Sequence, residues 1–73
     1  MPNNSNDRTE AMERAAEVRA VVAKNQIYYY QLADALGIHY ATLRRWVRSG
    51  VREDRYQKIM ETIGNMIGGE ANA

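Results

Sequence analysis

The chain has 73 residues, of which 45% are hydrophobic and 26% are charged, and its formal net charge is +1 at pH 7. A chain of this length encloses one hydrophobic core, so a two-domain organisation is excluded. The absence of cysteine excludes disulfides, thiolate catalysis and zinc sites built from thiolates. No apolar run approaches the roughly 20 residues that span a bilayer, and residues 1–7 lack a secretion-signal pattern. We therefore expect a cytoplasmic protein with no membrane partner.

The charged residues are divided unevenly along the chain. Residues 39–58 contain six Lys and Arg residues and two acidic residues, whereas the remainder contains four basic and seven acidic residues. A basic segment on an otherwise acidic chain orients a molecule toward a polyanion. A solvated helix surface is the alternative interpretation of this segment.

The first predicted helix covers residues 7–24, after a tail at residues 1–6 that we expect to be disordered. Asp7 followed by Glu10 matches a capping box. Asn25 is a residue type that ends helices in the left-handed conformation. One apolar stripe follows helical spacing, and it consists of Ala11, Ala15, Val18 and Val22.

Three further helices are predicted after Ile27. The second ends at Gly37, the third covers residues 40–48, and the fourth begins near Arg52 and ends or weakens at Gly64. A partial turn at residues 66–67 closes an ordered domain of residues 7–67, and residues 68–73 form a second disordered tail. No stretch alternates with a period of two. The sequence therefore predicts an all-α fold of four or five short helices around a central helix-turn-helix unit.

The central unit is predicted from the spacing of small and large apolar residues. Ala33 lies four residues before Gly37, Leu43 lies six residues after this glycine, and Trp46 follows three residues later. Two short helices that cross at about 90–120° through a tight turn require these residue types. The predicted helix-turn-helix core is Leu32, Ala33, Leu36, Gly37, Ile38, Leu43 and Trp46.

This pattern resembles the helix-turn-helix proteins of the lambda-repressor and Cro family, in particular their small single-domain prophage members. The resemblance covers residues 18–63 and implies a lambda-repressor-like fold. It also implies a sequence-specific transcriptional regulator whose helix at residues 40–48 reads the major groove of double-stranded DNA. The chain departs from the family at three positions, with Gln26 for a frequent glycine, Tyr28 for Ser or Thr, and Tyr29 for Gln.

The third predicted helix has two distinct sides. At about 100° per residue, Leu43, Trp46 and Val47 lie on the side that faces the core. A basic strip with one small residue lies on the other side, and it consists of Ala41, Arg44, Arg45 and Arg48.

This basic strip predicts the residues that contact DNA. The planar fork of arginine bonds guanine O6 and N7 together, so we expect Arg44 and Arg45 to read bases. The resemblance adds Tyr40 and Ala41 at base edges. Phosphate contacts carry no sequence code but fix the register, and the residues expected to make them are Tyr29, Tyr30, Thr42, Arg48 and Arg52.

We expect a homodimer, because one recognition helix contacts few base pairs and two-fold pairing places two helices on half-sites about 34 Å apart. The first predicted helix offers apolar surface at Met12 and Ala16. The fourth offers more, at Met60, Ile63, Met66 and Ile67.

No enzyme, cofactor or metal site is predicted. His39 is the only histidine, and it has no partner at metal-ligand spacing. No nucleophile has a recognisable base partner. His39 is instead a candidate for a weak helix cap or for a DNA contact.

Two other functions remain open at this point. Residues 42–46 also resemble the DNA-reading helix of excisionases and MerR-like factors, which place a β-wing after it; strands after Gly50 would favour that class. The same fold also serves protein-interaction modules such as antitoxins and anti-repressors, which engage their apolar surfaces with another protein.

Overall fold

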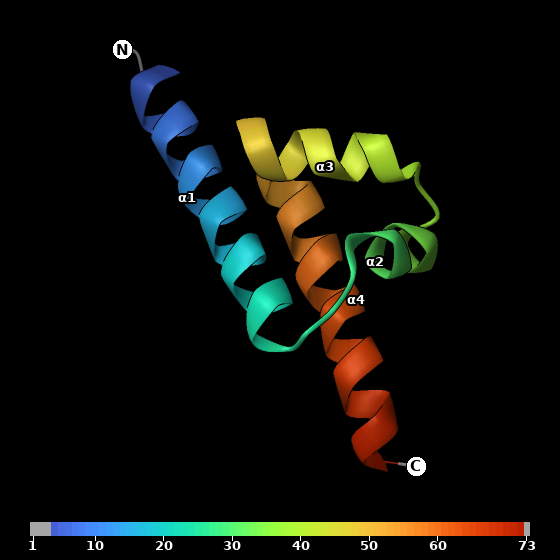
Figure 1. Cartoon of the computed structure of the whole chain (residues 1–73). Coiled ribbons are helices and arrows are strands. Elements are labelled where there is room, and N and C mark those ends of the chain that lie inside the picture. The colour runs from blue at the N-terminus through green and yellow to red at the C-terminus, as the bar shows by residue number, and fades with distance from the viewer. Residues whose placement is uncertain (1–3, 73) are drawn as a thin grey trace.

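The chain forms four helices and, within the described residues, no strand. The computed structural model describes the backbone of residues 4–72 and the side chains of residues 8–68. The helices are α1 (Asn4–Lys24), α2 (Tyr29–Leu36), α3 (Tyr40–Ser49) and α4 (Glu53–Asn72) (Figure 1). The all-α prediction with a central helix-turn-helix unit is confirmed. The outer helices are longer than predicted, with 21 residues in α1 and 20 in α4.

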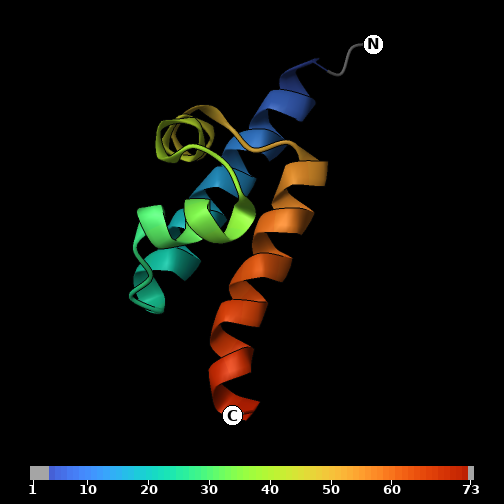
Figure 2. The ribbon, with the colours of Figure 1, turned by 90° about the vertical axis from the view of Figure 1, so that its right-hand side faces the viewer.

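The four helices surround one shared core. Helices α1 and α2 each contact both α3 and α4. Helices α1 and α4 run side by side in the same direction, and α3 lies across one end of α4 (Figures 1 and 2). The last turns of α4 extend beyond the other helices, away from α3. The molecule is therefore elongated, with extents of 48 × 23 × 19 Å.

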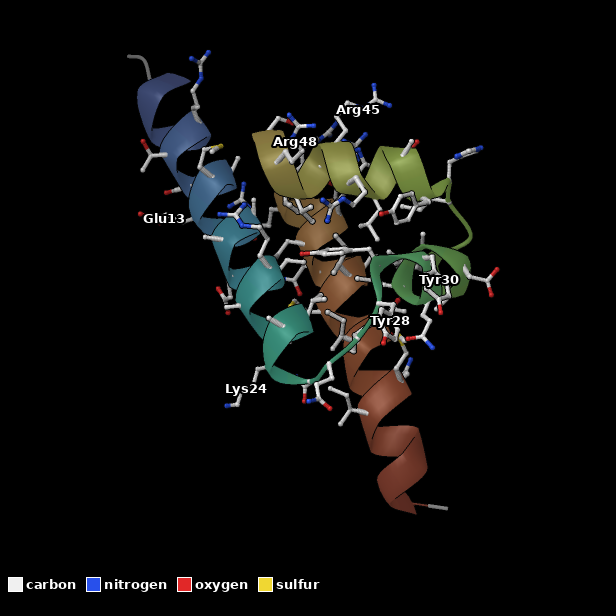
Figure 3. The ribbon with its side chains drawn as sticks, in the orientation of Figure 1. Glu13, Lys24, Tyr28, Tyr30, Arg45 and Arg48 are labelled. Carbon is white, nitrogen blue, oxygen red and sulfur yellow. The ribbon has the colours of Figure 1, made fainter. Side chains whose placement is uncertain are left out.

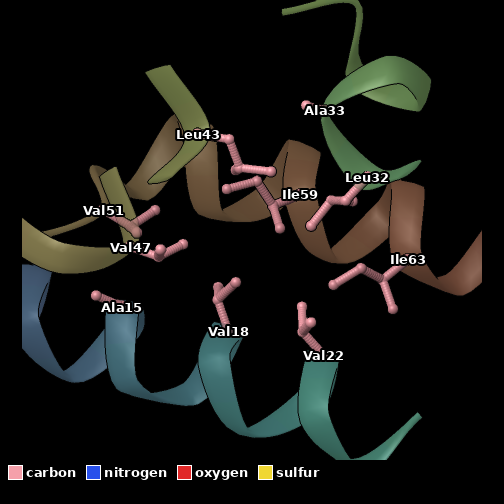
Figure 4. Close-up of a cluster of buried hydrophobic side chains, with 10 residues drawn as sticks. All are labelled: Ala15, Val18, Val22, Leu32, Ala33, Leu43, Val47, Val51, Ile59 and Ile63. Carbon is pink, nitrogen blue, oxygen red and sulfur yellow. The ribbon is translucent and has the colours of Figure 1, made fainter. Parts of the chain in front are cut away.

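The core consists of aliphatic side chains from all four helices and from the segment before α4. Burial of such side chains is the main force that holds a domain of this size together. Figure 4 shows these side chains converging between α1, α3 and α4, with α2 closing one side. The buried residues are Ala15, Val18, Val22, Leu32, Ala33, Leu43, Val47, Val51, Ile59 and Ile63.

The beginning and end of α1 differ from the prediction. The helix begins at Asn4, so Asp7 lies inside the helix and is not its cap, and only residues 1–3 of the predicted tail lie outside the described residues. Asn and Ser have only moderately unfavourable helix propensities, so residues 4–6 extend the helix. At the other end, the left-handed residue is Gln26, with φ +56°, and not Asn25. The side-chain amide of Asn25 instead donates to the carbonyl of Val21 at 2.9 Å.

Helix α4 continues through Gly64, where it was predicted to end, and through residues 68–72, which were predicted to be disordered. Ala73 lies outside the described residues. A glycine inside a helix costs only about 1 kcal/mol relative to alanine. Ile63 is 2% exposed and Met66 packs against the core, so burial on either side of Gly64 offsets this cost.

The turn between α2 and α3 has the geometry that Gly37 predicts. Gly37 has φ +74° at the C-terminal end of α2, a conformation that glycine adopts without strain. Its N–H donates to the Asp34 carbonyl at 3.1 Å, and the Ile38 N–H donates to the Ala33 carbonyl at 3.0 Å. These two bonds form a Schellman motif, which satisfies the last carbonyls of α2. The direction in which the chain enters α3 is thereby fixed.

The residues of the predicted helix-turn-helix core differ in how deeply they are buried. Leu32, Ala33 and Leu43 are buried as expected. Leu36, Ile38 and Trp46 are half-buried and pack against the core from its edge. One face of the Trp46 ring is covered by the guanidinium of Arg55 and not by apolar side chains. The guanidinium carbon lies 4.3 Å from the ring centroid.

The end of α3 is attached to α1 by hydrogen bonds. The Val51 N–H donates to the Ala11 carbonyl at 3.0 Å, and Arg14 Nε donates to the Val51 carbonyl at 2.6 Å. Arg19 donates to the carbonyl of Val47 in the last turn of α3. Carbonyls at the end of a helix lack intrahelical partners, so Arg19 supplies a missing donor to α3 itself. Arg14 binds the segment that follows α3, and both contacts hold this end of α3 against α1.

Helices α1 and α4 also meet at a polar pair. The pKa of Tyr56 on α4 lies above its usual value, chiefly because its hydroxyl hydrogen-bonds to the Glu17 carboxylate on α1 and further because the phenol is partly desolvated. This interaction favours the protonated form of the phenol, whose O–H is the hydrogen-bond donor to the Glu17 carboxylate. This contact joins the two long helices near the attachment of α3.

Gly50→Ala is expected to destabilise the fold by about 1–3 kcal/mol. Gly50 has φ +132°, a conformation that residues with a Cβ rarely adopt, and an added Cβ would lie 3.2 Å from the Cβ of Ala11. Chemical denaturation followed by circular dichroism measures the change. Gly64→Ala is the matched control, because no described atom lies within 4 Å of its added Cβ and alanine favours the helix. An unchanged unfolding midpoint for Gly50→Ala would contradict the close packing of this turn on α1.

Candidate nucleic-acid interface

Packing fixes which side of α3 faces solvent. Leu43 and Val47 are buried on its inner side, one turn apart. On the outer side Arg45 and Arg48 are exposed and project away from the rest of the chain (Figure 3). Tyr40, at the start of the helix, is 49% exposed. The rotation of α3 about its own axis is therefore determined by the core, and the outer side has a defined set of side chains.

These outer side chains form a continuous surface along α3. Ala41 is exposed between longer neighbours, so the surface has a low point in its first turn. An open concavity follows the outer side of the helix, and it is lined by Tyr40, Ala41, Arg44, Arg45, Arg48 and Ser49. All four residues predicted for base contact and one predicted for phosphate contact thus lie on one surface.

The cations on this surface are available to a ligand. Among residues 8–68, the only ion pair joins Arg52 Nε to Asp54 Oδ1 at 3.5 Å. Neither Arg45 nor Arg48 has a carboxylate within ion-pair distance in this range. Arg45 and Arg48 are therefore not held in ion pairs by any carboxylate of residues 8–68.

Arg44 lies on the outer surface of α3, as predicted, and in addition contacts a residue of α2. Its side chain is half-buried, and its guanidinium carbon lies 4.7 Å from the centroid of the Tyr29 ring. A guanidinium over an aromatic face gains about 0.5–1 kcal/mol at a partly exposed site. Arg44 therefore links α3 to the start of α2, and Arg45 is left as the free arginine of this turn.

The three consecutive tyrosines have different environments. Tyr29, one of the residues predicted for phosphate contact, is half-buried and packs against the core. Tyr28 and Tyr30 are exposed, and their rings stack with centroids 5.5 Å apart. The start of α2 is stabilised by Gln31, whose Oε1 accepts from the Tyr28 N–H at 3.2 Å. This contact compensates in part for the absence of a Ser or Thr cap.

The remaining residues predicted for phosphate contact lie at the margins of the surface. Thr42 is half-buried on α3. Arg52 precedes α4, and its contact with Asp54 is strongly exposed. An exposed pair of this kind is worth about 0–1 kcal/mol, so it leaves Arg52 able to exchange the carboxylate for a phosphate.

Three residues that support this surface were not predicted. Arg14 and Arg19 hydrogen-bond to the end of α3 and its following loop, and Arg55 covers Trp46. The sequence shows that these arginines stand beside apolar residues of α1 and α4. It does not show which groups they contact, because those groups belong to other segments of the chain.

No family model matches the chain, and neither the curated proteins nor the solved structures that were searched contain a match. Within the described residues, no helix has the length and apolar character needed to cross a membrane.

Proposed function

We propose that this protein is a sequence-specific DNA-binding regulator of transcription, which reads the major groove of double-stranded DNA with the outer side of α3. The observation that supports this proposal best is the pair of exposed arginines, Arg45 and Arg48, on a helix whose opposite side is held by the core. Arg45 reads bases and Arg48 contacts phosphate in this proposal. A repressor or Cro-like role agrees with the resemblance of the helix-turn-helix unit.

The geometry of α3 suits a duplex for three physical reasons. An α-helix fits the major groove, and the small side chain of Ala41 permits close approach near the helix start, where such helices contact base edges. Arg45 supplies a bidentate donor for guanine. Tyr40 borders the same surface and is half-exposed. A flexible loop would not hold these side chains in fixed positions relative to one another. Helix α3 does hold them, because it is attached to the rest of the molecule at both ends.

A winged architectural factor is less well supported. That class requires strands after the helix-turn-helix unit, and residues 53–72 form a helix. A protein-interaction module remains the second candidate, because apolar side chains are exposed away from α3.

Selection of bound fragments from a pool of random duplex DNA tests the proposal. We expect enrichment of one motif, and we expect log K for that motif to fall with log[salt] by about 0.9 for each phosphate neutralised. Recovery of random, unenriched sequences would contradict sequence-specific reading. Failure to retain any duplex at low salt would contradict DNA binding itself and favour the protein-interaction module.

A further inference from the structure

A groove lies between the start of α2 and the second half of α4. Its volume is about 480 Å³, and sites for small ligands occupy roughly 300–1,000 Å³. The α1–α2 connection forms part of its wall, at the end of α1 that lies away from α3 (Figure 1). Polar groups come from Asn25, Gln26, Tyr28 and Gln31, and apolar surface comes from Ile27, Met66 and Ile67. Apolar surface with a few polar groups is typical of a ligand site.

Two hydrogen bonds fix the orientation of side-chain amides in the groove. Asn25 Nδ2 donates to the Val21 carbonyl at 2.9 Å, and Gln31 Oε1 accepts from the Tyr28 N–H at 3.2 Å. A carbonyl only accepts and an N–H only donates, so neither amide can turn over without losing its bond. Neither bond uses Asn25 Oδ1 or Gln31 Nε2. The groove therefore has an acceptor and a donor in fixed roles.

Gln26 adds a third amide at a strained backbone position. Within residues 4–72 it is the only residue other than glycine with a positive φ, at +56°. Glycine adopts this conformation without strain, whereas residues with a Cβ are destabilised by it. Such strained residues are concentrated at functional sites, including ligand clamps. The glutamine thus places an amide at the groove although it lowers the stability of the turn.

The Tyr28 ring gives the groove a flat aromatic surface. The residue is 62% exposed although Tyr30 stacks against it, with ring centroids 5.5 Å apart and planes 17° from parallel. Tyr28 lines the groove and Tyr30 does not, so the stack supports the ring from outside the groove. Aromatic side chains bind unpaired nucleobases by stacking. A planar heterocycle therefore suits this surface.

Met66 and Ile67 supply aliphatic surface from α4. Both belong to the set of residues that was predicted to pair two copies of the chain. Ile63 of that set is not available to such an interface, because it is 2% exposed and lies in the core, and Met60 also packs against the core. The groove thus offers aliphatic as well as aromatic surface to a flat ligand.

The groove lacks cations for a phosphate. None of the described residues that line it is charged. Lys24, which precedes Asn25 in the chain, points away from Tyr28 (Figure 3). Lysine and arginine are the side chains that bind phosphates most strongly. The ligand is therefore recognised through a neutral ring, in contrast to the phosphates expected beside α3.

We propose that this groove binds an unpaired adenine base, with its ring on Tyr28 and its edge on the side-chain amides. Adenine has an amino donor beside a ring-nitrogen acceptor, and the amides of Asn and Gln pair with this edge. Guanine presents two acceptors on the same edge, and cytosine has a smaller ring to stack. A free nucleoside and a single strand both carry such a base. Helix α3 takes no part in this site, so the proposal does not depend on the proposed function.

Titration of the full chain with adenosine tests the site, followed through the side-chain amide signals of Asn25, Gln26 and Gln31 in NMR spectra. Inosine is the matched control ligand, because an acceptor oxygen replaces its amino group. We expect adenosine and adenosine monophosphate to bind alike, and inosine to bind about 5- to 150-fold more weakly. Equal binding of inosine, or no shift up to the solubility limit of adenosine, would overturn the proposal.

Tyr28→Leu and its matched control Tyr30→Leu test the stacking surface. The two residues are 62% and 61% exposed, so each variant replaces a similarly exposed ring by an aliphatic side chain. Tyr28→Leu should weaken adenosine binding about 5- to 150-fold, the range of base–aromatic stacking, and Tyr30→Leu should weaken it much less. Equal losses, or a loss in Tyr30→Leu alone, would contradict stacking on Tyr28.

Gln26→Gly tests the third amide without harm to the fold. Glycine relieves the strain at φ +56°, so the midpoint of chemical unfolding should stay the same or rise, while adenosine should bind more weakly. An unchanged affinity would remove Gln26 from the site and leave its strain unexplained by a ligand.

A single strand of deoxyadenylate distinguishes the two sources of the base. Tighter binding per base than adenosine assigns the groove to a single strand, and equal binding assigns it to a free nucleoside. Binding of neither would overturn the proposal. Because none of these measurements contains duplex DNA, their failure leaves the proposed function standing.

Discussion

Arg45→Ala is expected to lower the affinity for the selected duplex by about 1–3 kcal/mol, or roughly 5- to 150-fold, and to relax the base preference at one position. The side chain is exposed on the outer side of α3 and has no carboxylate partner among the described residues. Its removal therefore takes away a base contact and leaves the fold intact. Equilibrium binding to the selected site and to single-base variants of it measures both effects.

Two control variants separate base reading from charge and from packing. Lys24→Ala removes the same charge from the last turn of α1, which Figure 3 shows away from α3, and it should change affinity little once salt is present. Arg44→Ala should lower the stability of the fold, because its guanidinium lies over Tyr29, and should leave the base preference nearly unchanged. If Arg44→Ala relaxed the preference and Arg45→Ala did not, Arg45 would lose its assignment as the base reader.

Periodicity predicted the helices because each of them buries one side. Ala15, Val18 and Val22 recur at helical spacing in the sequence and lie in the core. The ends of the outer helices were not predicted, since local residue preferences are weak there. Gly64 shows why: its cost of about 1 kcal/mol is smaller than the gain from burying Ile63, and that gain depends on α1 and α2.

The sequence predicted only those features of the candidate site that depend on α3 alone. The spacing of Arg44, Arg45 and Arg48 correctly placed them away from Leu43. It could not distinguish Arg44 from Arg45, because Tyr29, which captures the Arg44 guanidinium, comes from a different helix. For the same reason the sequence did not reveal Arg14 and Arg19, whose acceptors lie 37 and 28 residues further along the chain.

These contacts make the outer side of α3 a rigid surface. The helix is fixed by the Gly37 turn at its start, by the core along its inner side, and by the two α1 arginines at its end. Groups that are held in place before binding lose little entropy when they bind. Disturbance of the inner side of α3 should therefore affect both the fold and the interface.

Leu43→Ala is expected to destabilise the protein by about 2–5 kcal/mol. Leu43 is 0% exposed, so its truncation removes buried methyl groups and leaves a cavity between α3 and α4. A single core in a domain below about 70–80 residues supplies only about 3–5 kcal/mol, so this variant should lose a large part or all of its stability at 25 °C. Loss of the helical signal in circular dichroism, with a lowered urea midpoint, measures this effect.

The matched control for Leu43→Ala is Met12→Ala, which truncates an exposed side chain and should stay within about 0.5 kcal/mol of the original chain. The selected duplex provides a second test, because Leu43→Ala keeps every residue on the outer side of α3. DNA that binds only the folded state adds about 2.7 kcal/mol at a hundred times its Kd, so its addition should restore much of the helical signal. An unfolding midpoint equal to that of the original chain would show that Leu43 does not hold α3 in place. A lowered midpoint that saturating duplex fails to raise would separate the fold from DNA binding and count against α3 as the reading helix.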